Sequence, residues 1–304
     1  MSTQLYDVVI IGSGPAGIQA GIHAARRKTR VLMLGRPENS ALYRGHIENY
    51  ACIPGVSEGP DLLQAGIDQV KRFGVEVLRQ DALKVEERDG LFSLEMENGQ
   101  SVQARSIVLC MGVAKKNLGV PGEQELLGRG VSYCVDCDAN FYRGAEVVVT
   151  GHRSAAVDGA LTLLSYAAKV YLVTDHLDVS PELLNRLQTS PVEYIQDSIK
   201  EIRGEKMVES ILLNNGTSIA AEGVFIELGS KGALQLATQI GVHLDSATMQ
   251  YIAVKRDQAT NIPGIYAAGD ITGPPLQMAK AVGEGCVAGM EAAMYARKQA
   301  SSKE

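Results

Sequence analysis

The 304-residue chain is poor in positive charge, in aromatic side chains and in long hydrophobic runs. Asp and Glu outnumber Lys and Arg, which gives a net charge of -6. Nucleic acid is therefore not an expected partner, because phosphate binding needs a basic face. No stretch approaches the roughly 18 unbroken apolar residues of a membrane span, and the first residues do not resemble a secretion signal. We expect a cytoplasmic protein that does not bind a membrane.

Cysteine and histidine are also scarce, with five of each. Structural zinc usually takes two pairs of Cys or His at short spacing, and only one such pair, Cys134 and Cys137, is present. The sequence therefore predicts no metal site. In a cytoplasmic protein this C-x-x-C would cycle between disulfide and dithiol rather than persist as a crosslink. We interpret it, with Asp138 directly after it, as a redox-active pair; an inert structural pair is the alternative.

The remaining composition favours α/β architecture. The chain is 45% hydrophobic and contains 32 glycines, enough for sizeable cores and many strand-to-helix turns. Its length predicts two domains. One basic run, residues 26–28 with Arg30, stands out against the acidic background. It is interpreted as a solvated helix end, with a docking patch as the alternative.

A dinucleotide-binding pattern opens the chain. A β-branched strand at 6–11 is followed by Gly-Ser-Gly-Pro-Ala-Gly at 12–17 and by an Ala-rich helix at 18–25. In such a turn the first glycine permits the tight bend, the second lets backbone approach a pyrophosphate, and the third allows the helix to pack on the strand. The N–H groups at the helix start then face the phosphates. After the next strand, at 30–34, Glu38 is the nearest acidic candidate for the ribose.

Three alternating segments follow at 82–87, 91–97 and 101–105, and Asn-Gly at 98–99 is a hairpin signal. They predict a small antiparallel sheet inserted in the dinucleotide fold. A separate buried strand is expected at 106–112, with Cys110 as a core residue.

A second strand-turn-helix unit begins at residue 145 and departs from the pattern at its turn. Arg153 stands where the second glycine should be, and residues 174–178 offer two carboxylates and no Arg. NADPH needs cations there for its 2′-phosphate, preferably Arg. We therefore expect a nucleotide-type fold that has lost its NADPH chemistry. Residues 191–229 repeat the plan of the first third of the chain, which indicates an internal repeat.

The Gly-x-Gly-x-x-Gly at 12–17, the Cys134-x-x-Cys137-Asp138 segment and a closing Ala-Gly-Asp at 268–270 together resemble the low-molecular-weight thioredoxin reductases. This resemblance covers nearly the whole chain. It implies an α/β fold of two Rossmann-like, three-layer dinucleotide-binding domains, the second inserted in the first. An FAD domain would comprise 1–115 and 246–304, a central dithiol domain 116–245, and the protein would be a homodimer.

The resemblance also implies roles for particular residues. Cys137 would be the flavin-proximal thiol, Cys134 the thiol that meets a thioredoxin-like partner, and Asp138 the acid/base. The expected cofactor-binding residues are Gly12, Ser13, Gly14, Pro15, Ala16, Gly17, Glu38, Asn49, Gly112, Gly269, Asp270, Gln277 and Met278. Rotation of the central domain would occur near residues 113–117 and 245–250.

The positions at which this sequence differs from the usual members of the family bear on the choice of electron donor. Besides Arg153 and residues 174–178, Leu-Gln-Met at 276–278 occupies the position of the usual Arg-Gln-Ala. This pattern resembles the branch that does not use pyridine nucleotides, which includes ferredoxin-dependent flavin thioredoxin reductases and relatives with a second FAD in the NADPH-type pocket. Two alternatives stay open: an NADPH-dependent thioredoxin reductase with an altered nucleotide site, and a non-catalytic, flavin-bearing redox sensor.

Overall fold

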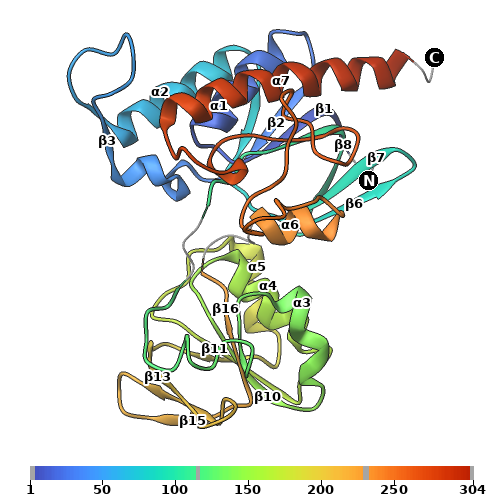
Figure 1. Ribbon diagram of the computed structural model, residues 1–304. Coiled ribbons are helices and arrows are strands. Elements are labelled where there is room, and N and C mark those ends of the chain that lie inside the picture. The colour runs from blue at the N-terminus through green and yellow to red at the C-terminus, as the bar shows by residue number, and fades with distance from the viewer. Residues whose placement is uncertain (1–3, 114–116, 229–232, 302–304) are drawn as a thin grey trace. The chain divides into compact units, whose positions relative to one another are not determined.

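The computed structural model describes residues 4–113, 117–228 and 233–301, and the chain divides into two compact units (Figure 1). The first unit combines Met1–Met96, Gln100–Val113 and Leu236–Glu304, and the second combines Glu97–Gly99 and Ala114–Gln235. Each unit is built on a largely parallel sheet covered by helices, which confirms the expected α/β class.

The first unit contains a seven-stranded sheet with the order β5-β2-β1-β8-β7-β6, and β17 also pairs with β8. Its strands are β1 (Gln4–Ile11), β2 (Val31–Leu34), β5 (Glu76–Leu78), β6 (Ala82–Arg88), β7 (Leu91–Met96), β8 (Ser101–Leu109) and β17 (Ile265–Ala267). Its other elements are α1 (Pro15–Ala25), η1 (Pro37–Asn39), η2 (Ala41–Arg44), the β3 (His46–Ile47) and β4 (Ser57–Glu58) pair, α2 (Gly59–Arg72), η4 (Asp270–Thr272) and α7 (Met278–Ser301). The second half of β1 and the whole of β2 are apolar and buried, as expected for parallel strands that helices cover.

Strand β8 differs from the expectation of two separate segments at 101–105 and 106–112. It is one continuous strand because β1 pairs along its whole length. On its other edge, the first half pairs antiparallel with β7 and the second half parallel with β17. Its burial correspondingly changes from alternating to continuous. The predicted antiparallel pairing of these segments is present, and β6 and β7 extend the main sheet through β8.

The second unit contains a five-stranded parallel sheet in the order β12-β11-β10-β16-β9 and a separate antiparallel sheet, β13-β14-β15. The strands are β9 (Val131–Ser132), β10 (Glu146–Thr150), β11 (Lys169–Val173), β12 (Glu193–Ile195), β13 (Ile199–Arg203), β14 (Ser210–Leu213), β15 (Ser218–Ala220) and β16 (Gly223–Ile226). The helices are α3 (Val135–Asp138), η3 (Ala139–Tyr142), α4 (Ser154–Leu163) and α5 (Pro181–Gln188), and α6 (Ala233–Gln239) spans the boundary between the units.

Small residues let α1 and α7 lie in close contact (Figure 1). A Cβ atom on Gly285 would lie 2.2 Å from the carbonyl oxygen of Ala16, and one on Gly289 would lie 2.2 Å from that of Ala20. These distances are far below van der Waals contact, so the helices reach this separation only because the two positions carry no side chain. The contact joins the two ends of the chain into one unit.

None of the helices in the described ranges is long and apolar enough to cross a membrane. Among the same residues, no cluster of three or more His, Cys, Asp or Glu side chains is placed to hold a metal ion.

Two glycine substitutions on α7 test this contact. We expect Gly289→Ala to lower the free energy of unfolding by about 1–3 kcal/mol, because the added methyl group meets backbone that cannot move aside. Gly283→Ala is the matched control, since a Cβ there meets nothing within 4 Å; it should stabilise the helix by about 0.5–1 kcal/mol. Chemical denaturation measures both changes, and destabilisation of equal size in the two variants would contradict the assigned cause.

Candidate active site

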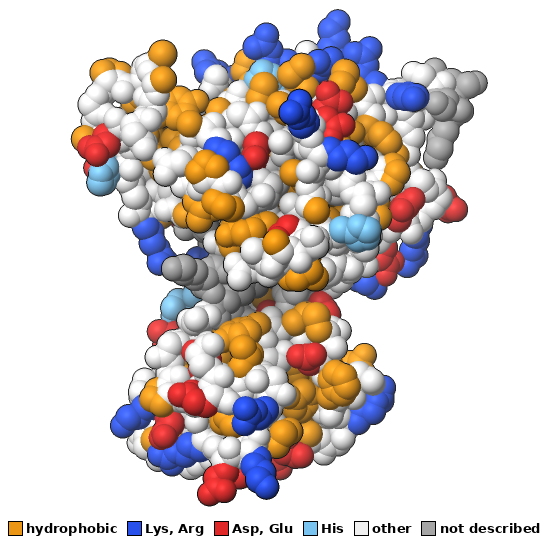
Figure 2. Space-filling model, in the orientation of Figure 1, with side chains coloured by type: hydrophobic (Ala, Val, Ile, Leu, Met, Phe, Trp, Pro, Cys, Tyr) orange, Lys and Arg blue, Asp and Glu red, His pale blue; other side chains and the backbone are white. Residues whose placement is uncertain are grey.

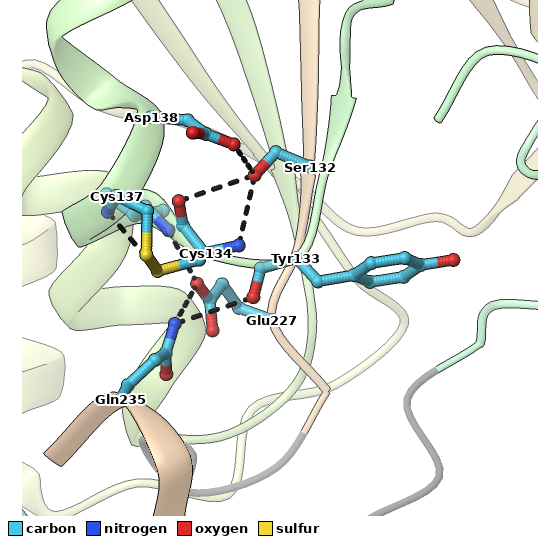
Figure 3. Close-up of a disulfide and its surroundings, with 8 residues drawn as sticks. Ser132, Tyr133, Cys134, Cys137, Asp138, Glu227 and Gln235 are labelled. Carbon is cyan, nitrogen blue, oxygen red and sulfur yellow. Dashed lines mark hydrogen bonds between the residues drawn. A yellow bond between two sulfur atoms is a disulfide. The ribbon is translucent and has the colours of Figure 1, made fainter. Parts of the chain in front are cut away.

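Cys134 and Cys137 form a disulfide in the second unit, with an S–S distance of 2.08 Å and Cα atoms 5.3 Å apart (Figure 3). Cys134 caps the start of the short helix α3, and its sulfur accepts a hydrogen bond from the Cys137 N–H at 3.2 Å. The helical turn brings the two thiols together because residues three apart face each other across one turn. Cys137 is exposed and Cys134 is half-buried.

Ser132 connects Asp138 to the disulfide segment. Its hydroxyl donates to Asp138 Oδ2 at 2.6 Å and accepts from the Cys134 N–H at 3.0 Å. The carboxylate that the sequence assigned to acid/base chemistry is thus oriented through a neighbouring hydroxyl. Ser132 was not recognised as a site residue from the sequence, because a Ser at the end of a short strand carries no pattern of its own.

A second carboxylate, Glu227, lies on the opposite side of the disulfide segment from Asp138 (Figure 3). It follows β16 and is 2% exposed. Its Oε1 accepts from the Val135 N–H at 3.0 Å and from Gln235 Nε2 at 2.9 Å. Sequence reasoning missed both Glu227 and Gln235. The available signal was a charged residue directly after a buried apolar strand.

The glycine-rich turn between β1 and α1 has the geometry of a phosphate cradle. A Cβ on Gly12, whose φ is +119°, would lie 2.3 Å from the Cys110 carbonyl oxygen, and one on Gly17 would lie 1.9 Å from the Gly12 carbonyl oxygen. Gly14 caps α1 without a side-chain hydrogen bond, and Pro15 starts the helix. The first N–H groups of α1 are therefore available to an anion. As expected, Cys110 is a buried core residue, and burial raises the pKa of its thiol.

Three buried polar atoms around this turn lack a hydrogen-bond partner within the described chain: Ser13 Oγ, Glu38 Oε2 and Asn39 Oδ1. Buried polar atoms are normally paired, so the site fits a ligand with hydroxyl and phosphate groups. Glu38 is held by an ion pair of 2.9 Å with Arg79, which, together with its own backbone hydrogen bond, outweighs the effect of burial and lowers the pKa of the Glu38 carboxyl. Its other oxygen, Oε2, has no partner in the described chain, so the prediction that Glu38 binds the ribose stays open. Asn39 was missed by sequence analysis.

The Ala-Gly-Asp motif at 268–270 lies close to the start of α1, next to the same glycine-rich turn. Gly269, with φ at +89°, lies so close to Ala16 that a Cβ atom on it would be 2.9 Å from the Ala16 Cβ. Asp270 begins η4, and the pKa of its carboxyl is raised by burial, opposed by Lys280 and reinforced by Glu284. Segments more than 250 residues apart in sequence thus lie against each other, and the predicted split site needs this proximity.

Two further predicted residues are joined by a hydrogen bond, from Asn49 Nδ2 to Gln277 Oε1 at 3.2 Å. Met278 is the first residue of α7, and Gly112 follows β8 with φ at +67°. Lys280, which sequence reasoning missed, donates to the carbonyl oxygens of Gly269 and Gly273 at 2.8 and 2.7 Å. It therefore fixes the backbone on both sides of Asp270.

In the second unit, the turn between β10 and α4 carries the side chains of His152 and Arg153 between its first glycine and the helix. Gly151 keeps the first glycine position, since a Cβ there would lie 2.1 Å from the Glu227 carbonyl oxygen. Arg153, at the second position, is only 16% exposed, and its Nε lies 3.7 Å from Asp178 Oδ2. The His152 and His176 rings stack with centroids 4.9 Å apart. Burial, with the charges of Arg153 and His176, lowers the pKa of His152.

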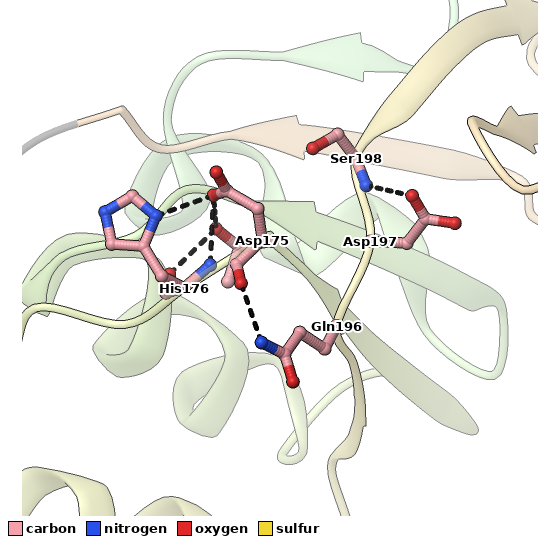
Figure 4. Close-up of polar contacts among 6 residues, drawn as sticks. Asp175, His176, Gln196, Asp197 and Ser198 are labelled. Atoms are coloured by element: carbon pink, nitrogen blue, oxygen red, sulfur yellow. Dashed lines mark hydrogen bonds and ion pairs between the residues drawn. The ribbon is translucent and has the colours of Figure 1, made fainter.

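Acidic and amide groups end the neighbouring strands β11 and β12 (Figure 4). Asp175 Oδ1 contacts His176 Nδ1 at 2.8 Å, and Gln196 donates to the Asp175 carbonyl oxygen at 3.1 Å. The hydrogen bond to His176 lowers the pKa of the Asp175 carboxyl. At neutral pH this edge of the sheet therefore presents negative charge, as the sequence predicted.

Comparison with known proteins gives the family. Residues 6–300 match the family model described as pyridine nucleotide-disulphide oxidoreductase. The thioredoxin reductase of Listeria monocytogenes is 34% identical over 319 residues, covering 99% of this chain and 97% of that protein. An atypical thioredoxin reductase from Desulfovibrio vulgaris Hildenborough is similar with a TM-score of 0.83 and 33% identity, covering 96% of this chain and 98% of that one.

A ferredoxin-flavin thioredoxin reductase from Clostridium acetobutylicum is similar with a TM-score of 0.71 and 32% identity, covering 98% of this chain and 100% of that one. The family implies FAD, which agrees with the turn and the orphaned polar atoms of the first unit. The chain therefore belongs to the pyridine nucleotide-disulphide oxidoreductases and is a flavoprotein disulfide reductase of the thioredoxin reductase type.

Proposed function

We propose that this protein passes electrons from FAD through Cys134 and Cys137 to a thioredoxin-like protein disulfide, with ferredoxin or a second flavin as donor in place of NADPH. The observation that carries the proposal is Arg153 at the turn of the second unit, folded in toward Asp178. Its side chain takes the space through which a pyrophosphate would approach the backbone. The names of the atypical and ferredoxin-flavin relatives support this choice.

The end of β11 supports the same conclusion. The 2′-phosphate of NADPH requires cations, whereas Asp175 and Asp178 place two carboxylates there. Asp178 is tied to the turn by its N–H, which donates to the His152 carbonyl oxygen at 2.7 Å. The polar groups of this turn thus form hydrogen bonds and ion pairs with one another. A second FAD, which lacks the 2′-phosphate, would meet less repulsion at this edge than NADPH; as the variant of the proposal it would need its pyrophosphate to lie away from Arg153.

FAD, held by the glycine turn at residues 12–17 with Ser13 and Glu38, would supply the two electrons that open the disulfide. The chain's own residues then carry out thiol–disulfide exchange. The Cys134 thiolate attacks one sulfur of the partner disulfide, which breaks that bond and forms a mixed disulfide. Cys137 attacks Cys134 in the mixed disulfide, which re-forms the internal disulfide and releases the partner as a dithiol. Asp138, oriented by Ser132, holds the proton that the thiols exchange. Rotation about residues 113–117 and 245–250 remains part of the proposal.

An anaerobic titration tests the donor. Reduced ferredoxin should bleach the flavin absorbance at stoichiometric amounts, whereas NADPH and NADH should leave it unchanged, because the second unit repels the 2′-phosphate and blocks the pyrophosphate. Flavin released by denaturation should be counted in the same samples. Two flavins per chain would support the second-flavin variant, and bleaching by one equivalent of NADPH would support the NADPH-dependent alternative instead.

A trapping experiment tests the thiol roles. Because the more exposed thiol is Cys137, the assignment of Cys134 as the exchanging thiol rests on family resemblance. We expect reduced Cys137→Ser to accumulate a mixed disulfide with oxidised thioredoxin, since no second thiol resolves it, and Cys134→Ser to accumulate none. Turnover should fall at least 100-fold in both variants. Cys52→Ser is the control because Cys52 is an exposed free cysteine of the first unit, and it should behave as the unchanged protein. The reverse trapping pattern would exchange the two roles, and unchanged turnover in Cys137→Ser would favour the redox sensor.

Docking of an acidic ferredoxin needs a local basic face on this acidic chain. Lys and Arg side chains gather along the upper rim of the first unit in Figure 2. At the end of α1, Arg26 and Lys28 are exposed, and Arg297 donates to the Arg27 carbonyl oxygen at 3.5 Å. This contact adds a cation from α7 to the basic run of the sequence. A second basic pair in the sequence, Lys115 and Lys116, lies outside the described residues.

Charge reversal tests this face. The double variant Arg26→Glu with Lys28→Glu should slow flavin reduction by ferredoxin about 10-fold at low salt and flatten the dependence of that rate on ionic strength. Lys206→Glu, an exposed change in the second unit, should leave both quantities within twofold of the unchanged protein. If the double variant and the control behave alike, the basic run is only a solvated helix end.

A further inference from the structure

The ammonium group of Lys280 is surrounded by oxygen atoms of the segment that carries Asp270. Lys280 lies in the first turn of α7. Its Nζ donates to the carbonyl oxygens of Gly269 and Gly273 at 2.8 and 2.7 Å, and to the Thr272 hydroxyl at 2.8 Å. An ammonium group has three N–H donors, so these three oxygens can take all of them. Lys280 therefore holds both ends of the segment around η4 at once.

Glu284, one turn further along α7, completes this network. Its Oε2 lies 3.0 Å from Lys280 Nζ and accepts from the Gly269 N–H at 2.9 Å. The Thr272 hydroxyl lies 2.8 Å from the same oxygen. The side chains of Lys280 and Glu284 are only 16% and 20% exposed, so water competes weakly for these bonds. One i,i+4 pair therefore holds both polar groups of the Gly269 backbone, the N–H through a carboxylate and the carbonyl oxygen through an ammonium.

The segment at 269–273 has little regular structure of its own. Its helix η4 is only three residues long, and the flanking Gly269 and Gly273 have φ values of +89° and +104°. Gly269 is also the part of the segment that lies against α1, since a Cβ atom on it would be 2.9 Å from the Ala16 Cβ. The contacts that hold Gly269 therefore also set the position of the Asp270 backbone relative to the start of α1.

Lys280 also affects the charge of Asp270, whose side chain is half-buried. Burial raises the pKa of the Asp270 carboxyl, Lys280 opposes this rise, and Glu284 reinforces it. The cation thus favours the ionised carboxylate, which is the form that only accepts hydrogen bonds and can take them from hydroxyl groups.

We propose that Lys280 and Glu284 are positioning residues for FAD, and that together they hold the segment at 269–273 in the shape that presents Asp270 to hydroxyl groups of the cofactor. This inference rests on the predicted role of Asp270 in FAD binding, which belongs to the proposed function. A segment that the chain's own side chains hold in place loses less conformational entropy on binding, so FAD is held more tightly.

Lys280→Ala tests this role on the oxidised holoprotein. The rate at which bound FAD exchanges with isotope-labelled FAD should be followed by mass spectrometry of the flavin that the protein retains after gel filtration. We expect exchange to be about 10-fold faster in the variant, because a charge-assisted network is lost. Lys71→Ala is the matched control, since Lys71 is an exposed lysine of α2 in the same unit, and it should leave the rate unchanged. An unchanged rate in Lys280→Ala, or equal acceleration in both variants, would overturn the proposal.

A double-variant cycle separates positioning from a general loss of stability. Asp270→Asn alone should accelerate exchange, because the carboxylate is gone. In that background Lys280→Ala should add less than about twofold, because no carboxylate remains to be positioned. If the two factors simply multiply, Lys280 does not act through Asp270 and the proposal is wrong. No acceleration in Asp270→Asn would refute the predicted role of Asp270, and this inference with it.

Chemical rescue tests the ammonium group itself. Lys280→Ala removes three carbon atoms and the ammonium, so n-propylammonium matches the deleted atoms. Added to the variant, this cation should return the exchange rate to within about threefold of the unsubstituted protein, because it restores the N–H donors. Tetramethylammonium carries the same charge and no N–H group, and it should leave the rate of the variant unchanged. Equal effects of the two cations would contradict the proposal.

Thr272→Val keeps the proposal testable if Lys280→Ala does not fold. It removes only the hydroxyl that lies between Lys280 and Glu284. Exchange should become about threefold faster, and a rate equal to that of the unsubstituted protein would overturn the proposal. None of these measurements uses an electron donor or thioredoxin. A protein that NADPH reduces but that shows the expected exchange rates would therefore refute the proposed donor and leave the roles of Lys280 and Glu284 intact.

Discussion

The nucleotide site of the first unit depends on the close contact between α1 and α7. This contact exists because Gly285 and Gly289 leave room for the carbonyl oxygens of Ala16 and Ala20. It anchors the C-terminal segment on the N-terminal one, so that Gly269, the residue before Asp270, lies against Ala16. A site made from both ends of the chain thus needs no ligand to bring its halves together. Packing between two helices, which buries mostly alanine and glycine, does so.

The turns of the two strand-turn-helix units differ in which glycines they contain. Comparing them distinguishes a glycine that packing requires from one that a ligand would require. In both units the first glycine is required by packing: a Cβ on Gly12 or on Gly151 would lie within 2.3 Å of a carbonyl oxygen of the neighbouring strand. The second position has no such constraint in the second unit, where Arg153 folds beside Asp178. Gly14 is retained in the first unit, where its backbone borders the orphaned Ser13 hydroxyl. Packing therefore requires the first glycine in both units, whereas the second position accommodates an arginine in the second unit.

The residues that sequence analysis recognised are those with a local pattern. The glycine turn, the C-x-x-C pair and the Gly-Asp at a strand end each combine a fixed spacing with a chemical reason, and they identified the family before the structure did. Ser132, Glu227, Gln235 and Lys280 were missed because their roles come from contacts between separate segments. Val135 and Glu227 are 92 positions apart in sequence, and a single Glu after a buried strand predicts no partner. The continuous course of β8 was missed for a similar reason, since its two halves pair with strands that are distant in sequence.

The proposed donor determines how much free energy is available for reducing the dithiol. Plant-type ferredoxins have potentials near about -400 mV, and thioredoxin lies near about -270 mV. The interval of roughly 130 mV corresponds to about 6 kcal/mol for two electrons. A dithiol with a potential inside that interval could accept electrons from such a donor and pass them to thioredoxin, both with a favourable free energy. The side chains that fill the second nucleotide turn fit a protein that takes its electrons from a donor of this kind.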